Sequence, residues 1–592
     1  AIRYMKEKAT ASYLKKGQDI VDMNHAAIDA GATAFVKVDV PAEWADAVDH
    51  AETEKLEGRE KTVKMVKTIL DPVDKMDGDS LPVSAFVDHA DGTFELGASA
   101  YEKRGVSVTV PVWHADRCVQ CNNCAFVCPH ATLRPFALDD EEAANAPAAA
   151  KLLPIKIGKG KNKYKFTMTV SPLDCMGCGV CASQCGTHAL EMVPMESQLE
   201  QQEVFDYCVK NVSDKPDMFK ADNVKFSQFK TPHLEFSGSC AGCAETSYAR
   251  LVTQLFGDHM MISNATGCSS IWGGPAATSP YTVNKEGKGP AWANSLFEDN
   301  AEHGLGMYLG QKKIRDDLKA KVETIADKIP EAQAWLDTFD DTDANQAASK
   351  ALIAALEAKD CGCETCKAIL DYKSYLNKKS CWIFGGDGWA FDIGFGGVDH
   401  VLASGENVNV FVFNTEVYSN TGGQASKASN IGQVAQFAAA GKEIKSKSLA
   451  EIAMTYGYVY VAQIAMGANK VQTLAAITEA EAYPGPSLII AYSPCEMHSI
   501  RGGMTNCQKE MDKAVKCGYW NLFRFDPSKE SGKFTLDSKL PAGGYREFLM
   551  NEARYSRLTR EFPERADTLF TASEENAKAR YEHLQRLVEM YK

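Results

Sequence analysis

Residues 381–420 read CWIFGGDGWAFDIGFGGVDHVLASGENVNVFVFNTEVYSN. CWIFGG and NVFVFN are short, continuously apolar runs, which is typical of strands buried on both faces of a parallel sheet. Between them, Ile393, Val398, Val401 and Leu402 follow roughly helical spacing. We therefore predict a strand–helix–strand unit in an α/β domain whose mostly parallel sheet carries helices on both faces. Ligands of such sheets bind at the carboxyl ends of the strands.

Polar residues follow both expected strands. Asp387 lies between Gly386 and Gly388 at the end of the first strand, and Thr415 follows the second. Magnesium prefers oxygen ligands and takes several of them from phosphate and water. Asp387 could supply a carboxylate, Thr415 a hydroxyl and Val417 a backbone carbonyl, and the glycines would let a diphosphate approach the backbone. The pattern predicts a magnesium–diphosphate site, with a Rossmann-like nucleotide site or a plain strand–helix turn as the alternatives.

A second signal is a pair of cysteine runs. Residues 117–130 read RCVQCNNCAFVCPH, with the spacing Cys-x2-Cys-x2-Cys-x3-Cys, and residues 175–185 repeat that spacing. It resembles the spacing of bacterial ferredoxins, in which three cysteines of a run bind one [4Fe–4S] cluster and the fourth binds the other. The resemblance implies one ligand set of Cys118, Cys121, Cys124 and Cys185, and a second set of Cys175, Cys178, Cys181 and Cys128. Two zinc sites are the alternative, but zinc ribbons favour two separated pairs.

Three further stretches contain cysteines. FSGSCAGCAETSYARL holds Cys240 and Cys243, NATGCSSIWGG holds Cys268, and IIAYSPCEMHSIRGG holds Cys495 after an apolar run. Together they could supply the four thiolates of a third cluster, built into the domain that holds the diphosphate site. On spacing alone, an isolated CxxC pair is more often two buried thiols or a zinc half-site.

The combination of motifs carries a family resemblance. Besides the cysteine runs and Gly386-Asp387-Gly388, the chain contains Asn264-Ala-Thr-Gly-Cys268-Ser-Ser and Tyr418-Ser-Asn-Thr-Gly-Gly-Gln-Ala-Ser-Lys427. Over nearly its whole length it resembles the pyruvate:ferredoxin (flavodoxin) oxidoreductases of the large 2-oxoacid oxidoreductase family. The resemblance implies oxidative decarboxylation of pyruvate on thiamine diphosphate with Mg2+, acetyl transfer to coenzyme A, and one-electron transfers through three [4Fe–4S] clusters to ferredoxin or flavodoxin in anaerobic metabolism.

The resemblance also assigns roles to residues. The ligands of the cluster nearest the thiamine would be Cys240, Cys243, Cys268 and Cys495. The magnesium ligands would be Asp387, Thr415 and the carbonyl of Val417. The diphosphate cradle would consist of Gly386, Asp387, Gly388, Trp389, Thr415, Glu416, Val417, Tyr418, Ser419 and Asn420.

Two side chains have expected roles at the reacting centre. Glu245 and Cys268 match family positions that touch the cofactor, and Asn420 matches the asparagine that meets the substrate. The Asn420 amide could donate a hydrogen bond to charge that develops on the substrate. From the sequence alone, Glu245 also fits a carboxylate at a helix N-terminus, and Asn420 fits a turn residue before Thr421.

The resemblance covers only the later part of the family's chain. The family begins with a domain that supplies an activating glutamate and the main pyruvate contacts, and we find no such domain in this sequence. We therefore expect a C-terminal half that needs an N-terminal half, within a homodimeric assembly, and that does not turn over alone. The expected parts are the tail of a preceding α/β domain (1–50), a linker (51–105), a ferredoxin-like domain with two clusters (106–213) and a thiamine diphosphate-binding domain with the third cluster (214–592).

Composition bounds these expectations. The 592 residues are enough for several domains, and 45% of them are hydrophobic. The net charge of −14, without a long Lys or Arg block, argues against nucleic acid or an anionic membrane as partner. No apolar run reaches the length of a membrane span. The 19 cysteines, without a secretory signal, favour metal or redox chemistry in the cytoplasm over disulfides.

Another function and two smaller features stay open. The alternative function is an electron-transfer subunit of another 2-oxoacid:ferredoxin oxidoreductase, or of an iron–sulfur complex without thiamine, with two clusters only. The trio Cys361, Cys363 and Cys366 follows a helical stretch and is expected to be a cysteine-rich loop. His498 and Arg501 could meet coenzyme A or a partner, although a structural pair is the favoured interpretation.

Overall fold

The structure is a computed structural model that describes residues 1–14, 17–46, 56–159, 161, 163–216, 218–275, 277–359 and 363–592. The chain forms two compact units, Ala1–Gly58 and Arg59–Lys592. The described part of the first unit contains α1 (Ile2–Tyr13), α2 (Gln18–Gly31) and the turn η2 (Ala42–Asp46). The two helices bury Val21. That this unit is the tail of an α/β domain stays a prediction.

Residues 59–107 form short packed helices, where the sequence suggested a linker. The helices are α3 (Glu60–Met65), η3 (Val66–Leu70), α4 (Asp71–Asp74), η4 (Gly78–Ser80), η5 (Val83–His89) and η6 (Ala98–Tyr101). Met65, Ile69 and Leu70 are buried, while the neighbouring Lys64 and Lys67 are exposed. The charged character of the segment therefore belongs to an amphipathic surface.

The ferredoxin-like part is built from two small antiparallel sheets. One pairs β1 (Thr109–Trp113) with β5 (Leu190–Pro194), and the other has the order β2 (Leu133–Leu138), β4 (Lys165–Val170), β3 (Leu153–Pro154). Phe166, Met168 and Trp113 share their core. The helices and turns of this part are η7 (Ala115–Arg117), α5 (Asn123–Val127), α6 (Asp140–Ala144), α7 (Val180–Ser183), η8 (Met195–Gln198) and α8 (Glu200–Asn211).

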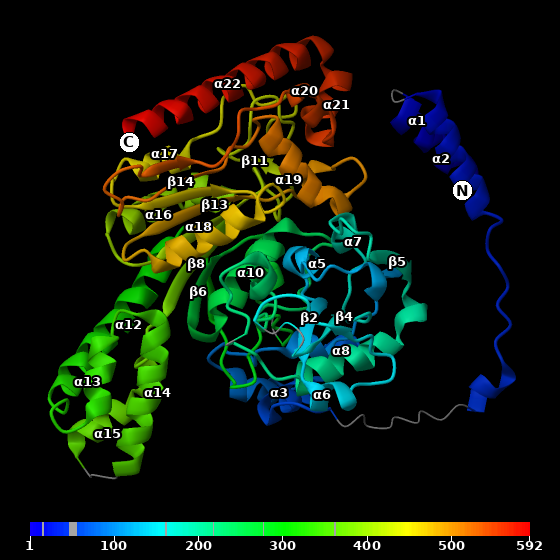
Figure 1. Ribbon diagram of the computed structural model, residues 1–592. Coiled ribbons are helices and arrows are strands. Elements are labelled where there is room, and N and C mark those ends of the chain that lie inside the picture. The colour runs from blue at the N-terminus through cyan, green and yellow to red at the C-terminus, as the bar shows by residue number, and fades with distance from the viewer. Residues whose placement is uncertain are drawn as a thin grey trace. The chain divides into compact units, whose positions relative to one another are not determined.

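An eight-stranded sheet organises the remainder, in the order β15-β14-β12-β13-β9-β8-β6-β7 (Figure 1). Its strands from β12 to β7 are parallel, and β14 and β15 are antiparallel at one edge. The strands are β6 (Met260–Ala265), β7 (Ala291–Ser295), β8 (Ser380–Gly386), β9 (Asn409–Asn414), β12 (Tyr460–Ile464), β13 (Ser487–Tyr492), β14 (Phe523–Phe525) and β15 (Phe534–Leu536). Every residue of β9 and β13 is buried, so helices cover both faces, as the continuous apolar runs predicted.

The helices connect and cover these strands. They are α9 (Val224–Ser227), α10 (Ala244–Phe256), α11 (Cys268–Gly273), α12 (Asn300–Glu323), η11 (Gly388–Ile393), α16 (Phe395–Ala403), α17 (Leu449–Met454), α18 (Lys470–Ala482), η12 (Glu496–His498), η13 (Met504–Asn506), α19 (Cys507–Lys516), α20 (Tyr545–Met550), α21 (Ala553–Glu561) and α22 (Pro563–Met590). A small hairpin, β10 (Val417–Tyr418) with β11 (Gln424–Ala425), follows β9.

The register of the sheet decides where the site lies. Gly386 at the end of β8 pairs with Phe413 of β9, and Asn414 at the end of β9 pairs with Tyr492 at the end of β13. These three parallel strands therefore end at one edge, where Asp387, Thr415 and Cys495 follow them.

A helical projection extends from the far part of α12. It consists of α13 (Pro330–Asp337), α14 (Thr342–Lys359), α15 (Glu364–Asp371) and η10 (Lys373–Tyr375), around a core with Trp335 and Leu352 (Figure 1). Cys366 is buried there and Cys363 is exposed, whereas Cys361 lies outside the described residues.

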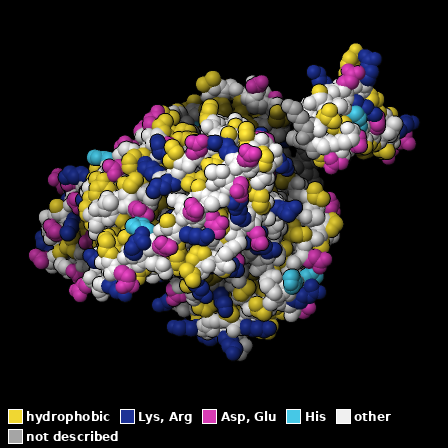
Figure 2. All heavy atoms as spheres, turned by 90° about the horizontal axis from the view of Figure 1, so that it is seen from above, with side chains coloured by type: hydrophobic (Ala, Val, Ile, Leu, Met, Phe, Trp, Pro, Cys, Tyr) yellow, Lys and Arg dark blue, Asp and Glu magenta, His cyan; other side chains and the backbone are white. Residues whose placement is uncertain are grey.

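None of the helices in the described ranges is long and apolar enough to cross a membrane. Figure 2 shows acidic and basic side chains interspersed over the visible face, without a continuous basic area. This surface agrees with the distribution of charge along the sequence.

Candidate active site

The loops after β8 and β9 bring the three expected magnesium ligands together. Thr415 Oγ1 lies 3.0 Å from Asp387 Oδ1 and 3.0 Å from the carbonyl oxygen of Val417. Neighbouring ligands of an octahedral ion with bonds of about 2.1 Å lie roughly 3 Å apart. The two distances from Thr415 Oγ1 thus match the spacing of neighbouring ligands around a magnesium ion.

Asp387 is completely buried in this loop. Its carboxylate accepts hydrogen bonds from the Thr415 N–H at 3.1 Å and from Ser426 Oγ at 2.5 Å. Burial raises the pKa of Asp387 to about 7 in spite of these donors. A bound cation would favour the charged form of this carboxyl, so its surroundings suit a metal ligand.

A pocket opens beside these oxygens at the edge of the sheet. It is lined by Glu245, Thr266, Gly267, Cys268, Ser269, Phe297, Gly386, Gly388, Trp389, Thr415, Val417, Tyr418, Ser419, Asn420 and Thr421. A Cβ atom on Gly388 would lie 2.5 Å from the ring of Tyr418, so only glycine leaves this wall open. The indole N–H of Trp389 is buried without a partner in the described chain, and a ligand could satisfy it. The residues fit a diphosphate and its magnesium ion.

Glu245 also lines this pocket. It lies in the first turn of α10 and accepts a hydrogen bond from Trp272 Nε1 at 3.1 Å. Burial raises the pKa of Glu245 to about 7, and the charge of Asp387 acts in the same direction. Glu245 is therefore both a carboxylate at a helix N-terminus and a lining residue of the pocket.

The hairpin after β9 supplies the remaining wall. Asn420 is exposed at its tip and lines the pocket, as do Tyr418 and Ser419. Ser419 Oγ lies 3.4 Å from Cys268 Sγ, which connects the hairpin to the third cysteine set.

The side chain of Glu416 is not in this pocket, contrary to the expectation for the cradle. Its carboxylate accepts hydrogen bonds from Tyr519 at 2.5 Å and Arg554 at 2.7 Å, in a buried ion pair. The φ angle of Glu416 is 60°, which turns its side chain away from Thr415 and Val417. Only the backbone of Glu416 remains a candidate for cofactor contact.

The third cysteine set gathers at the same edge of the sheet. Cys243 precedes α10, Cys268 begins α11 and Cys495 precedes η12. Burial raises the pKa of Cys243, Cys268 and Cys495, and each is further raised by the charge of Glu245. The Cys243 and Cys495 thiols lie close enough to Cys268 to raise its pKa, and the exposed Cys240 raises the pKa of Cys495 in the same way. The structure therefore collects the four residues from three distant segments.

The two ferredoxin-type sets are each assembled from both runs. Burial raises the pKa of Cys118 and Cys124, and the thiols of Cys121 and Cys185 raise it further. In the other set, burial raises the pKa of Cys175 to about 11, and it also raises the pKa of Cys178 and Cys181, with Cys128 adding to each. The neighbours are those that the ferredoxin resemblance implies, although ligation itself stays a prediction.

Backbone conformation repeats between the runs. Gln120 and Asn122 have φ angles of 57° and 58°, and Gly177 and Gly179 at the matching positions have 64° and 71°. The N–H groups of Gln120 and Gly177 each donate to the sulfur two residues earlier, at 3.4 Å. Gly186, just after the second run, has no left-handed φ, and no atom lies within 4 Å of a Cβ atom added to it.

The described side chains do not form a compact site for a single metal ion. Among the residues that the structure describes, no group of three or more His, Cys, Asp or Glu side chains could hold one. Cysteine spacing and mutual proximity define the candidate cluster sites, and the oxygen geometry at Asp387 defines the candidate magnesium site.

The sequence did not point to several supporting residues. Ser426 lies within the quoted Tyr418–Lys427 motif, so its place near Asp387 could have been found there. Trp272 likewise lies in the quoted stretch that holds Cys268, whereas Arg554 reaches the site from a distant segment that no local pattern marks. His498 is completely buried and cannot meet coenzyme A from solvent, whereas Arg501 is exposed.

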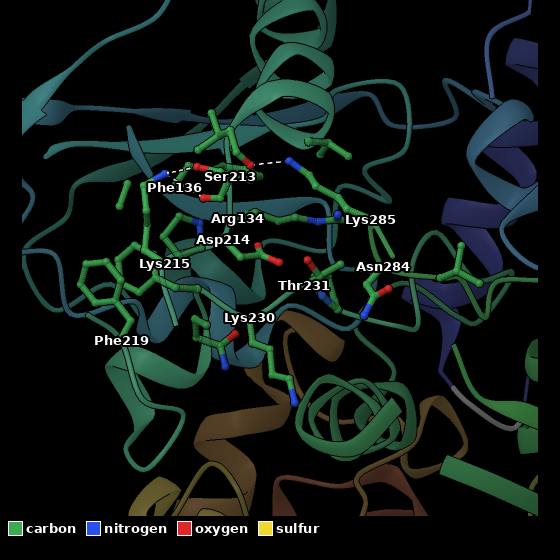
Figure 3. A pocket seen from close by; sticks show the side chains of 18 residues that line it. Arg134, Phe136, Ser213, Asp214, Lys215, Phe219, Lys230, Thr231, Asn284 and Lys285 are labelled. Carbon is green, nitrogen blue, oxygen red and sulfur yellow. Dashed lines mark hydrogen bonds between the residues drawn. The ribbon is translucent and has the colours of Figure 1, made fainter. Parts of the chain in front are cut away.

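A second pocket lies apart from this edge and shares no lining residue with it (Figure 3). Its cations bond within the chain: Lys215 pairs with Glu142 at 3.0 Å, Arg134 pairs with Glu235, and Lys285 donates to a backbone carbonyl. Because these charges are engaged, we assign no ligand to this pocket.

Comparisons with known families agree with the geometry. Residues 367–491 match the family "Thiamine pyrophosphate enzyme, C-terminal TPP binding domain", residues 117–189 match "4Fe-4S dicluster domain", and residues 51–107 match EKR, a domain of unknown function. The first two ranges contain Asp387 and Thr415, and all eight cysteines of the ferredoxin-type runs.

Curated proteins match nearly the whole chain. It is 48% identical to a pyruvate-flavodoxin oxidoreductase of Klebsiella pneumoniae, over 99% of this chain and 50% of that protein. The resemblance to the pyruvate:ferredoxin (flavodoxin) oxidoreductases is confirmed. A pyruvate:ferredoxin oxidoreductase of Moorella thermoacetica is also 48% identical, over 100% of this chain and 51% of that protein. A mitochondrial pyruvate dehydrogenase [NADP(+)] of Euglena gracilis is 42% identical, over 100% of this chain and 33% of that protein. The chain thus spans about half the length of the first two relatives.

Proposed function

We propose that this chain is the thiamine- and cluster-binding half of a pyruvate:ferredoxin (flavodoxin) oxidoreductase. The observation that carries the proposal is the meeting, at one sheet edge, of the Asp387–Thr415–Val417 oxygens with the third cysteine set. A pure electron-transfer subunit would have no use for a magnesium–diphosphate site next to a cysteine set.

The chain's own residues would hold the cofactor as follows. Asp387, Thr415 and the Val417 carbonyl bind magnesium, and the backbone around Gly388 receives the diphosphate. Trp389 and Glu245 line the pocket, and the side-chain amide of Asn420 donates a hydrogen bond to the substrate. Thiamine diphosphate, when bound, supplies the chemistry that decarboxylates a 2-oxoacid.

The three cysteine sets would bind [4Fe–4S] clusters, which carry single electrons. Cys268 lines the thiamine pocket, so the third set is the nearest to the cofactor. The segment that begins at Cys495 reaches the ferredoxin-like part, where Thr505 Oγ1 donates to the Cys178 carbonyl at 2.7 Å. The set with Cys178 is therefore next, and the set with Cys118 is the exit towards ferredoxin or flavodoxin.

The reaction needs groups outside these residues. We infer that an N-terminal half supplies the activating carboxylate and the main 2-oxoacid contacts, in an assembly that is homodimeric. Pyruvate is the substrate inferred from the names of the relatives, and coenzyme A is inferred from the family resemblance.

The test is an anaerobic assay of the native material with any chain that co-purifies. Pyruvate is added with and without coenzyme A, and cluster reduction is followed by absorbance. Reduction stimulated by coenzyme A is expected. Reduction by another 2-oxoacid only would change the substrate, and no reduction by any 2-oxoacid with intact clusters would favour the electron-transfer subunit.

A further inference from the structure

His498 lies between the loop of the magnesium site and the loop of the third cysteine set. It ends η12, the turn that follows Cys495, and its own N–H donates to the Cys495 carbonyl at 2.9 Å. Its side chain has no exposed surface. Whatever His498 does, it therefore does through contacts within the chain.

The two ring nitrogens make different bonds. Nδ1 accepts the N–H of Cys495 at 3.4 Å, and Nε2 lies 2.7 Å from the carbonyl oxygen of Thr415. An accepting Nδ1 holds no proton, so in the neutral ring the proton is on Nε2. Nε2 therefore donates to Thr415, and one imidazole joins the backbones of two candidate metal ligands.

The surroundings hold the ring in this orientation. Tyr492 stacks against it with ring centroids 6.5 Å apart, and Glu552 Oε1 lies 3.8 Å from Nδ1. Glu552 in turn accepts from Arg554 Nε at 2.6 Å. The ring is therefore packed and cannot turn without disturbing a buried ion pair.

We propose that His498 is a positioning residue that holds both the magnesium loop at Thr415 and the backbone of the third cysteine set at Cys495, through one ring nitrogen each. The proposal rests on the function proposed above. Its bond to the Thr415 carbonyl orients the residue whose hydroxyl faces Asp387. Its bond to the Cys495 N–H fixes the backbone that aims the Cys495 thiolate. Supporting bonds of this kind typically change metal affinity by roughly 10–100-fold when they are removed.

Two substitutions separate the two bonds. His498→Asn places an amide oxygen near Nδ1, so it keeps the acceptor for Cys495 and loses the donor to Thr415. His498→Gln places an amide N–H near Nε2, so it keeps the donor and loses the acceptor. His233→Asn is the matched control, because His233 is also buried and its ring bonds backbone groups such as the Thr253 carbonyl at 3.2 Å, not those of Thr415 or Cys495.

The experiment uses the chain with clusters reconstituted anaerobically. Calorimetry measures the affinity for magnesium–thiamine diphosphate, and electron paramagnetic resonance records the signal that Cys495→Ser removes. We expect His498→Asn to weaken the affinity about tenfold with an unchanged signal. We expect His498→Gln to keep the affinity and change the signal, and the control to change neither.

Several results would overturn the positioning role of His498. One is a change of both the affinity and the signal in each of the two variants. Another is no change of either. A third is loss of the ferredoxin-type signals in both variants, which would indicate a merely structural histidine. An unsubstituted chain that binds no magnesium–thiamine diphosphate would contradict the proposed function instead. The signal of His498→Gln would then still test the bond to Cys495.

Discussion

At the scale of single residues, the site depends on carboxyls that the fold removes from water. Burial raises the pKa of Asp387 and of Glu245 to about 7. Glu245 lines the pocket, Asp387 lies between its lining residues Gly386 and Gly388, and both raise the pKa of Cys495. Groups with such shifted pKa values are typical of functional sites, because a charged ligand can stabilise the ionised form that burial alone disfavours.

Magnesium binding should therefore depend on pH. With a pKa of about 7, Asp387 is mostly protonated at pH 6 and mostly charged at pH 8. The affinity for magnesium–thiamine diphosphate should be about tenfold weaker at pH 6, and binding there should release a proton. Calorimetry in buffers of different ionisation enthalpy measures both. Asp387→Asn should remove the part of the dependence that is due to this carboxyl, and an unaltered profile in that variant would contradict the assignment.

The same carboxyl affects stability when no metal is bound. Its folded pKa lies above its unfolded pKa, so the unfolded chain loses the proton first as the pH rises. The contribution of Asp387 to stability is therefore present below pH 4 and is lost as the pH rises towards 7. Thermal unfolding without magnesium should show this decrease, and Asp387→Asn should flatten it.

Removal of the Asp387 charge should separate cofactor binding from cluster binding. Asp387→Asn keeps the size of the side chain but should weaken magnesium–thiamine diphosphate binding roughly 10–100-fold. The iron content should not change, because the cysteine sets keep their ligands. Asp399→Asn in α16 is the control, since that carboxylate accepts a hydrogen bond from the Tyr456 hydroxyl at 2.8 Å. Equal losses of affinity in the two variants would count against a metal ligand at Asp387.

At the scale of elements, the site depends on how the loops after β8 and β9 pack. Gly388 faces the Tyr418 ring across the pocket wall, so the β10–β11 hairpin and η11 can approach each other only at a glycine. Gly388→Ala should displace the hairpin and weaken thiamine diphosphate binding more than tenfold. Gly396→Ala in α16 has no neighbour within 4 Å of the new methyl group and should be neutral or stabilise by about 0.5–1 kcal/mol. Calorimetry and thermal unfolding distinguish the two, and a benign Gly388→Ala would contradict this packing.

Helix α21 holds the loop after β9 through one buried ion pair. Arg554 bonds Glu416, whose left-handed backbone directs the Val417 carbonyl back towards Thr415. Arg554→Met leaves the buried carboxylates of Glu416 and Glu552 without their shared cation and should destabilise this region by about 3–5 kcal/mol. Hydrogen exchange of the amides at residues 415–417 should therefore become much faster. Arg557→Met on the same helix breaks only an exposed pair with Glu561, and equal exchange in both variants would contradict the role of Arg554.

At the scale of the whole molecule, the sequence predicted the elements with strong local patterns. The spacing within the two cysteine runs predicts their cluster ligands, and the apolar runs before Asp387 and Thr415 each predict a strand. The meeting of Cys240, Cys268 and Cys495 needed the family resemblance, because each comes from a different element. Arg554 and His498 had no local signal for their roles, since they act on residues 138 and 83 positions away.

The segment over residues 59–107 shows a different limit of the sequence. Its lysines and aspartates suggested a linker, but the apolar residues between them form one buried stripe with Met65 and Ile69. Short helices of this length have little intrinsic stability and form because they pack on the rest of the unit. Local composition could not show that surface.

The central claim is that a third cluster accompanies the thiamine site in this chain. The most direct measurement is the iron and acid-labile sulfide content of the anaerobically reconstituted chain, beside that of Cys495→Ser and Cys517→Ser, the latter a buried cysteine outside the three sets. We expect three clusters per unsubstituted chain, two in Cys495→Ser and three in Cys517→Ser. Two clusters in all three proteins would contradict it and favour the electron-transfer subunit.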